Sequence, residues 1–248
     1  MVILTAGLSL LEFYKMNFNG TKFASIPALI VGSASIILIY YYQDNLSFTT
    51  AAGVGRYISW IIILITVIVV LFLVIQLILF PKNIIFTNNL IILSVGIVYV
   101  CLFLSYLVLL RRLPDGKDWI FLTLLLVWSA DIGAYIAGKM LGAHKLCPVI
   151  SPKKTIEGAL GGMAAAVATA YFARLCFFKE LPLAHCVILA LGIAVIGQVG
   201  DLCESTFKRM GDIKDSGNLL PGHGGMLDRI DSLLFAAPFV YYYNMLIL

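Results

Sequence analysis

Long uncharged stretches alternate with short polar segments along this chain. Stretches long enough to cross a bilayer, which takes about 20 residues, are found at 23–43, 57–81, 83–110 and 181–200. Shorter candidates are 119–138, 158–173 and 230–248, and 1–13 is a further helix or part of one. The pattern predicts an all-α, polytopic integral membrane protein with seven to eight transmembrane helices.

The composition excludes an ordinary soluble domain. Hydrophobic residues make up 61% of the 248 positions and charged residues 12%, with a mean hydropathy of +1.01. Soluble domains are roughly 45–50% apolar. The net charge of +4 is modest and suits contact with an anionic lipid surface. We therefore expect a lipid bilayer, and no nucleic acid, as a partner.

Charged and polar residues are unevenly distributed between the two halves of the chain. We expect a single helical membrane domain over 1–248, with an apolar scaffold half at 1–110 and a catalytic half at 118–248. Charges in the first half are few and lie mostly at segment ends, where long side chains snorkel to the interface: Glu12, Lys15, Lys22, Asp44, Arg56 and Lys82. The chemistry is therefore expected in the second half.

Asp131 is an acid inside an otherwise apolar stretch. A carboxylate in that position needs a partner or a water-filled cavity. Lys139 and Lys145 are candidate structural partners. Small neighbours permit close helix packing or a cavity wall: Gly133, Ala134, Ala137 and Gly138.

The segment 151–158 reads Ser-Pro-Lys-Lys-Thr-Ile-Glu-Gly and predicts a polar loop that leads into a Gly/Ala-rich helix. Thr155 or Ser151 can cap that helix through its hydroxyl. Lys153 and Lys154 come just before its positive end, an arrangement typical of an anion site. Taken alone, the two lysines are also explained as cytoplasmic anchors.

Half of the charged residues at 118–248 are concentrated between positions 201 and 231. If the helix at 181–200 continues, one of its faces carries carboxylates, a hydroxyl and an ammonium group: Asp201, Glu204, Ser205 and Lys208. Asp228 and Asp231 are three apart and are expected to share a face of the last helix. Carboxylates from two helix ends can converge on one hard cation, and oxygen ligands of this kind suit Mg²⁺.

A glycine-dense turn at 217–225 separates these two helix ends. Such a turn lets backbone N–H groups approach a phosphate closely. Countercharge is available from Lys208, Arg209, Lys214 and Arg229. Carboxylates that can hold a metal, together with basic side chains that can bind phosphates, indicate phosphoryl or nucleotidyl transfer. Each feature alone has a simpler explanation: a solvated connector, a hydrogen-bonded His223, or helix N-terminal acids.

The combination is specific. The segment reads Ser205-x-Phe-Lys-Arg-(x4)-Lys214-Asp215-x-Gly-x-x-Leu-Pro-x-His223-Gly-Gly-Met-x-Asp228-Arg-Ile-Asp231. It resembles the signature of the phosphatidate cytidylyltransferases, or CDP-diacylglycerol synthases. The stretches 128–139 and 151–158 are also similar to that family, whereas the first 110 residues match only in being helical and apolar.

The resemblance implies a reaction of CTP with phosphatidate that gives CDP-diacylglycerol and pyrophosphate. It implies a Mg²⁺ site in which Asp201 and Asp228 are the leading ligands, and the helix-face argument adds Asp231 as a nearby ligand or support. The residues expected to carry catalysis are Asp201, Lys208, Asp228 and Asp231. Those expected to bind substrate are Lys153, Lys154, Ser205, Arg209, Lys214, Asp215, His223, Gly224, Gly225 and Arg229. The family also suggests a homodimer.

Two other functions stay open. A CTP-dependent polyprenol or lipid kinase would share a CTP site but would require a general base. A transporter would place charged residues at mid-membrane, whereas here they gather near one face.

The loops 139–154 and 201–229 fall on the same side, and their basic residues place them in the cytoplasm. The loop 111–118 then lies outside, against that bias. We expect a multi-pass protein of the inner membrane of a bacterium-like cell, with its active site facing the cytoplasm.

Overall fold

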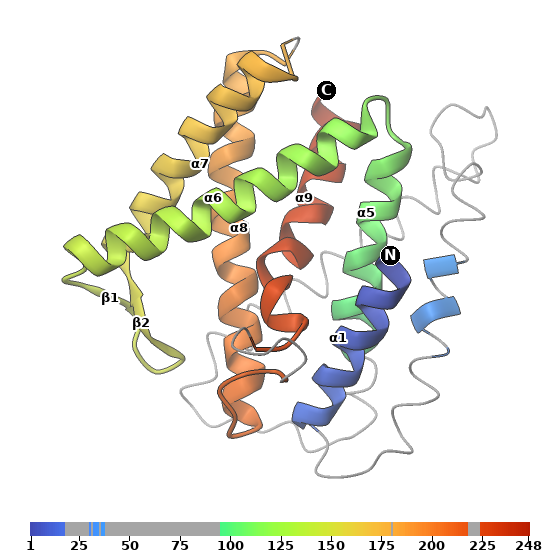
Figure 1. Ribbon diagram of the computed structural model, residues 1–248, viewed down its shortest axis with the longest axis vertical. Coiled ribbons are helices and arrows are strands. Elements are labelled where there is room, and N and C mark those ends of the chain that lie inside the picture. Colours follow the sequence, from blue (N-terminus) through green and yellow to red (C-terminus); the bar gives the residue numbers. More distant parts are fainter. Residues whose placement is uncertain (18–29, 31, 35, 38–94, 180, 218–223) are drawn as a thin grey trace.

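The computed structural model describes residues 1–17, 30, 32–34, 36–37, 95–179, 181–217 and 224–248 (Figure 1). Its helices are α1 (Val2–Asn17), the π-helical turn η2 (Ile97–Leu102), α5 (Phe103–Arg112), α6 (Gly116–Leu141), α7 (Ile156–Cys176), α8 (Leu183–Met210), the 3-10 turn η3 (Leu227–Arg229) and α9 (Asp231–Ile247). A short antiparallel hairpin joins α6 to α7 and consists of β1 (Lys145–Cys147) and β2 (Ser151–Thr155). The all-α prediction is confirmed in that the described residues are mostly helical, and the short hairpin is the exception to it.

Three helices in the described part of the chain are long and apolar enough to cross a membrane: α6, α7 and α8. They correspond to the predicted spans 119–138, 158–173 and 181–200. The stretch 57–81 lies outside the described residues, as does most of 23–43, and 83–110 is described only from residue 95. The total of seven to eight spans stays a prediction.

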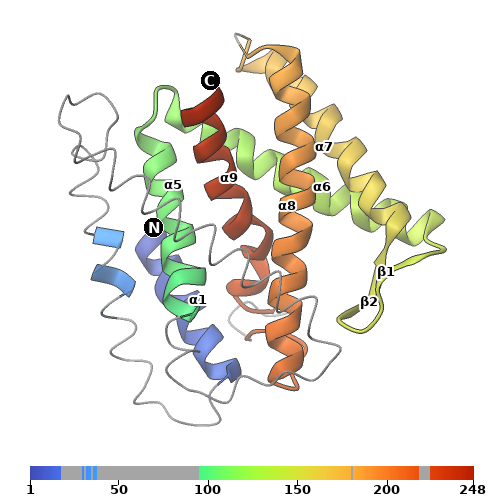
Figure 2. The same ribbon diagram turned by 180° about the vertical axis from the view of Figure 1, so that it is seen from behind.

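Helix α8 is central to the arrangement of the described helices. In both views α8 lies between α7 and α9, and α5 and α1 pack on the other side of α9 (Figures 1 and 2). An aromatic cluster joins α1, α5, α8 and α9, with ring centroids 5.0 Å apart for Phe13–Phe207 and 5.3 Å apart for Phe103–Phe235. Edge-to-face pairs of this kind add ~0.5–1.5 kcal/mol each beyond the area they bury. They fix α1 against the end of α8 that carries the polar segment.

Small residues allow α6 and α7 to pack closely, as the sequence predicted for the surroundings of Asp131. Gly133 of α6 faces Gly161 and Ala165 of α7, and Gly158 faces the carbonyl of Ala134. A methyl group on Gly133 would lie 2.8 Å from the Gly161 carbonyl oxygen. The two helices therefore have no room for a side chain at this crossing.

Gly133→Ala is expected to lower the stability of the detergent-solubilised protein by about 1–3 kcal/mol, the usual cost of overpacking. Gly7→Ala is the matched control, because a methyl group at Gly7 of α1 would meet nothing within 4 Å. The control should unfold at the wild-type temperature or above it, since alanine favours helix over glycine. Thermal unfolding followed by circular dichroism compares them, and equal midpoints for the two variants would contradict the packing argument.

Candidate active site

The sequence predicted that one face of α8 carries Asp201, Glu204, Ser205 and Lys208, and that face is present. α8 continues beyond Asp201 as far as Met210. Ser205 donates its hydroxyl hydrogen bond to Asp201 Oδ1 at 3.4 Å, and Lys208 forms an ion pair with Glu204 one turn earlier. The Glu204 side chain is fully buried. The last turns of α8 therefore hold two acids and a lysine in contact.

An acidic cluster forms where α8 meets the start of α9. Asp201, Glu204 and Asp231 each offer a carboxylate oxygen, and these oxygens lie within 4.8 Å of one another. Like charges at that spacing repel unless a cation is nearby. Two lysines supply part of the compensation: Lys154 Nζ lies 2.6 Å from Asp201 Oδ2, and Lys208 pairs with Glu204. An all-oxygen donor set is the kind that hard divalent cations prefer, so these residues fit a divalent metal.

Asp228 lies beside this cluster and has different partners. It belongs to η3, and its carboxylate accepts hydrogen bonds from Lys208 Nζ at 2.9 Å, Gly225 N at 2.7 Å and Ser216 N at 3.1 Å. Burial favours the neutral form of Asp228, but hydrogen bonds with Glu204, Lys208 and the Gly225 amide outweigh it and lower its pKa to about 2. Asp228 is therefore ionised at neutral pH.

The expectation that Asp228 and Asp231 share a face of the last helix was wrong. α9 begins only at Asp231, and Asp228 lies in the 3-10 turn before it. The physical reason is that the backbone amides of Ser216 and Gly225 hold the Asp228 carboxylate against the preceding loop. The two acids consequently have separate surroundings.

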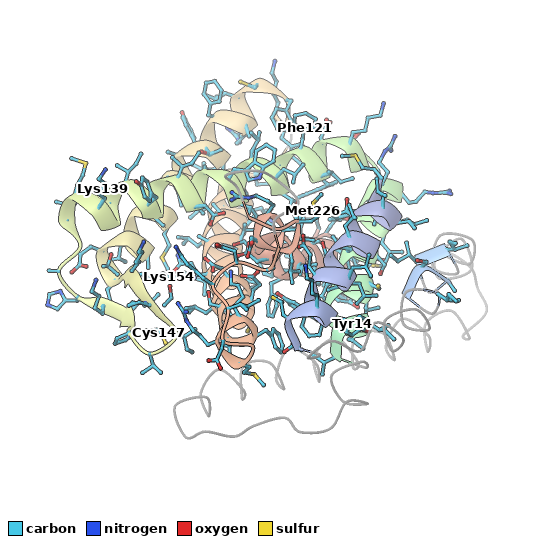
Figure 3. The ribbon with its side chains drawn as sticks, turned by 60° about the horizontal axis from the view of Figure 1, so that its bottom comes forward. Tyr14, Phe121, Lys139, Cys147, Lys154 and Met226 are labelled. Carbon is cyan, nitrogen blue, oxygen red and sulfur yellow. The ribbon has the colours of Figure 1, made fainter. Side chains whose placement is uncertain are left out.

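The β-hairpin brings basic residues of the second predicted motif to the same end of α8. Lys154 of β2 points toward α8, where it meets Asp201 (Figure 3). Arg209 donates from Nε to the carbonyl oxygen of Ile150 at 3.2 Å, which ties the hairpin to α8. Thr155 caps α7, since its hydroxyl oxygen accepts from Gly158 N at 3.1 Å. The predicted cap is confirmed.

A cavity of about 520 Å³ opens between α6, the hairpin, α7 and α8. Its polar lining residues are Asp131, Tyr135, Lys139, Lys153, Lys154, Thr155, Gln198 and Asp201. Asp131 therefore shares this cavity with Lys154 and Asp201. Across the described segments, no ion pair joins Asp131 to Lys139, whose ammonium group lies 5.9 Å from the centre of the Tyr135 ring. The cavity and the acidic cluster meet at Asp201.

Comparison with known proteins identifies the family of this chain. The sequence pattern of the cytidylyltransferase family matches residues 1–247, almost the entire chain. The chain belongs to the cytidylyltransferase family.

Curated relatives of this cytidylyltransferase carry the name phosphatidate cytidylyltransferase. The protein of Bacillus subtilis (strain 168) is 44% identical over 151 residues, which cover 60% of this chain and 56% of that protein. The protein of Staphylococcus saprophyticus is 35% identical over 225 residues, 90% of this chain and 81% of its own. That of Staphylococcus aureus (strain COL) is 46% identical over 126 residues, 50% and 48% of the two chains. The resemblance read from the motifs is confirmed, and the chain is an enzyme of the nucleotidyltransferase type.

The other predicted site residues of the cytidylyltransferase fall into three groups. The first group is exposed and consists of Lys153, Lys214, Asp215 and Arg229. His223 lies outside the described residues. Gly224 has a positive φ of 81°, and a methyl group there would lie 2.6 Å from Asp228 Oδ2. The described ends of the glycine-dense turn therefore approach carboxylates of the protein itself.

Glu12 contacts residues next to the candidate site, and these contacts were not predicted from the sequence. Glu12 was grouped with charges that snorkel to the interface, but it is 9% exposed and hydrogen bonds to the far end of the chain. The sequence does contain one signal. Glu12 is the only acid in α1, and an acid in an apolar segment is a functional candidate by default.

Proposed function

We propose that this cytidylyltransferase transfers the cytidylyl group of CTP to phosphatidate and forms CDP-diacylglycerol and pyrophosphate. The observation that carries the proposal is the convergence of Asp201, Glu204 and Asp231 with Lys154 and Lys208 beside a cavity at one end of α8. Carboxylates for a metal and ammonium groups for phosphates are what transfer between two phosphate esters requires. The names of the curated relatives support the same reaction.

In the proposed reaction a phosphate oxygen of phosphatidate attacks the α-phosphorus of CTP in line. A new phosphorus–oxygen bond forms as the bond to the β-phosphate oxygen breaks, and pyrophosphate leaves with that electron pair. The phosphate of the lipid is already an anion, so no activated serine or cysteine is needed. Lys154 and Lys208 would exchange carboxylate partners for phosphate oxygens and neutralise charge in the transition state.

We further propose Mg²⁺ as the metal, held by Asp201 and Asp231 with Glu204 as a third donor. When bound, the ion would neutralise phosphate oxygens and orient the triphosphate. Asp228, which the family resemblance names as a ligand, borders this group across Lys208. Its amide and lysine contacts suit it both to complete the site and to hold Lys208 in place.

The remaining basic residues are proposed phosphate contacts. Lys153 and Lys154 line the cavity, whose α7 wall would admit the lipid from the side. Arg209 and Lys214, with Ser205, Asp215, His223, Gly224, Gly225 and Arg229, would surround the nucleotide.

We propose that the chain is a single multi-pass membrane domain with seven to eight spans. The end of α8 that carries the site would face the cytoplasm of a bacterial cell. The α5–α6 turn lies at the opposite end of the molecule (Figure 1), which supports placing these two basic regions on different sides. We also propose a homodimer, and exposed apolar side chains on α6 and α7, such as Trp128 and Phe172, offer a surface for lipid or a second copy.

A transfer assay with CTP labelled at the α-phosphate or the γ-phosphate tests the reaction. Membranes supplied with phosphatidate and Mg²⁺ should move the α-label into the chloroform phase, and Asp228→Ala should remove that activity. Asp212→Asn is the matched control, since Asp212 is exposed and has a positive φ of 53° that asparagine tolerates. Lipid labelled only from the γ-phosphate would indicate a lipid kinase, and transfer from neither position would favour a transporter.

A further inference from the structure

We propose that Glu12 of α1 is a positioning residue for the nucleotidyl-transfer site, acting through the loop that connects α8 to η3. The inference rests on the proposed function for its effect on the reaction, while its effect on the loop stands on geometry alone.

Both carboxylate oxygens of Glu12 are used by residues more than 200 positions away. Glu12 Oε2 accepts from the Ser216 hydroxyl at 3.1 Å and from Leu227 N at 2.9 Å. Glu12 Oε1 accepts from Met226 N at 3.0 Å. The side chain thus binds Ser216 in the loop after α8 and the residues at the start of η3 at once. Figure 3 shows Met226 on the side of the site that faces α1.

Two glycines of the signature are explained by this carboxylate. A methyl group on Gly217 would lie 2.6 Å from Glu12 Oε1. One on Gly225 would collide with Ser216 Oγ and Glu12 Oε2. Neither glycine has a positive φ, so backbone freedom does not explain them. The requirement is space for the Glu12 carboxylate.

Glu12 is linked to the acidic cluster by a continuous series of contacts. Ser216, which Glu12 holds through its hydroxyl, donates its backbone N–H to Asp228. Asp228 accepts from Lys208, and Lys208 pairs with Glu204 of the cluster. Glu12 and Asp228 therefore both bind Ser216 and residues at or next to the start of η3. A change at Glu12 is expected to reach Lys208 without any contact with substrate.

The rest of α1 keeps this carboxylate in a fixed place. The adjacent Phe13 is buried against Phe207 of α8, with ring centroids 5.0 Å apart, and against Tyr99 at 5.9 Å. Asn17 donates to the Phe13 carbonyl oxygen at 2.8 Å and closes the end of the helix. Burying a carboxylate costs several kcal/mol unless its hydrogen bonds are satisfied. The three donors of the loop supply that compensation.

Glu12→Gln is the informative variant, because glutamine keeps the size of the side chain but offers one acceptor oxygen in place of two. At least one loop donor then loses its partner. We expect kcat/KM to fall roughly 10–100-fold, the usual effect of removing an indirect orienting contact, with the KM for CTP raised. Lys15→Gln, an exposed site on the same helix, should match wild type.

The effect of Glu12 on the loop and its effect on the reaction require separate measurements. Amide hydrogen exchange on the full-length protein should be faster at Met226 and Leu227 in Glu12→Gln than in Lys15→Gln, whatever the reaction proves to be. Faster exchange combined with a raised KM for CTP supports the proposal. Faster exchange with unchanged kinetic constants, or a loss of active enzyme with unchanged KM, would reduce Glu12 to a structural role. Unchanged exchange would overturn the proposal outright.

Failure of the proposed function would be visible separately. Wild-type protein that transfers no label from CTP to phosphatidate refutes that reaction, while equilibrium binding of labelled CTP still tests Glu12. Weaker CTP binding by Glu12→Gln than by Lys15→Gln would support its positioning role, and equal binding would count against it.

Discussion

Asp231→Asn is expected to reduce cytidylyl transfer by a factor on the order of 10²–10³ or more, the usual cost of removing one charge-stabilising group, while the protein stays folded. Asp231 contributes one of the three carboxylates of the cluster. The two nearby lysines pair with the other acids, Asp201 and Glu204. The substitution therefore removes a proposed cation ligand without breaking either ion pair.

The same substitution has an opposite effect on stability in the absence of divalent metal. Three carboxylates whose oxygens lie within 4.8 Å repel one another, so removing one charge should leave the unfolding temperature unchanged or raise it. Wild type should gain stability when millimolar Mg²⁺ is added, because an ion that binds only the folded state stabilises it. Asp231→Asn should lose most of that gain.

Thermal unfolding with and without Mg²⁺, together with the α-label transfer assay, measures both effects. Asp212→Asn serves again as the control, with full activity and a wild-type response to Mg²⁺. An Asp231→Asn protein that keeps its activity, or that is still stabilised by Mg²⁺ as wild type is, would remove Asp231 from the site.

Local patterns in the sequence predicted much of the site. The face of α8 that carries Asp201, Ser205 and Lys208 follows from helical spacing alone, as does the cap at Thr155. Helical geometry fixes such relations between residues three or four positions apart. The separation of Asp228 from Asp231 was not predictable in this way. It depends on where α9 begins. That start is determined by loop amides, and no periodic pattern in the sequence indicates their positions.

The features that the sequence did not predict depend on contacts between residues far apart in the chain. Glu12 bonds to residues 204 to 215 positions away, and nothing in the spacing of α1 specifies which distant amides meet it. The second strand of the hairpin was predicted to be part of a polar loop. Strands as short as β1 and β2 show little alternation of apolar and polar residues. Each of these features depends on tertiary contacts, which a single sequence specifies only weakly.

Three of the basic residues predicted to bind phosphate already contact other groups of the protein in this structure, and this changes how they are interpreted. Lys154 and Lys208 neutralise the carboxylates of the cluster, and Arg209 holds the hairpin. In the proposed reaction, a lysine with this double role would stabilise the acids before substrate arrives and bind phosphate afterwards. Removing one should therefore damage the fold as well as the reaction.

Lys208→Met is accordingly expected to destabilise the protein by about 3–5 kcal/mol, the typical cost of leaving a buried charge without its partner. The Lys208 side chain is 15% exposed and that of Glu204 is fully buried, so water cannot replace the missing ammonium group. Asp228 loses the same partner. The unfolding temperature should fall by on the order of 10 °C, and cytidylyl transfer should be lost.

A double variant separates the two roles of Lys208. Adding Glu204→Gln to Lys208→Met removes the stranded buried charge, so most of the lost stability should return, whereas activity should not. Thermal unfolding in detergent and the α-label assay on the single and double variants complete the cycle. If the double variant is no more stable than Lys208→Met, then Lys208 does not stabilise the protein through its ion pair with Glu204. If it recovers transfer, Lys208 contributes only to the fold.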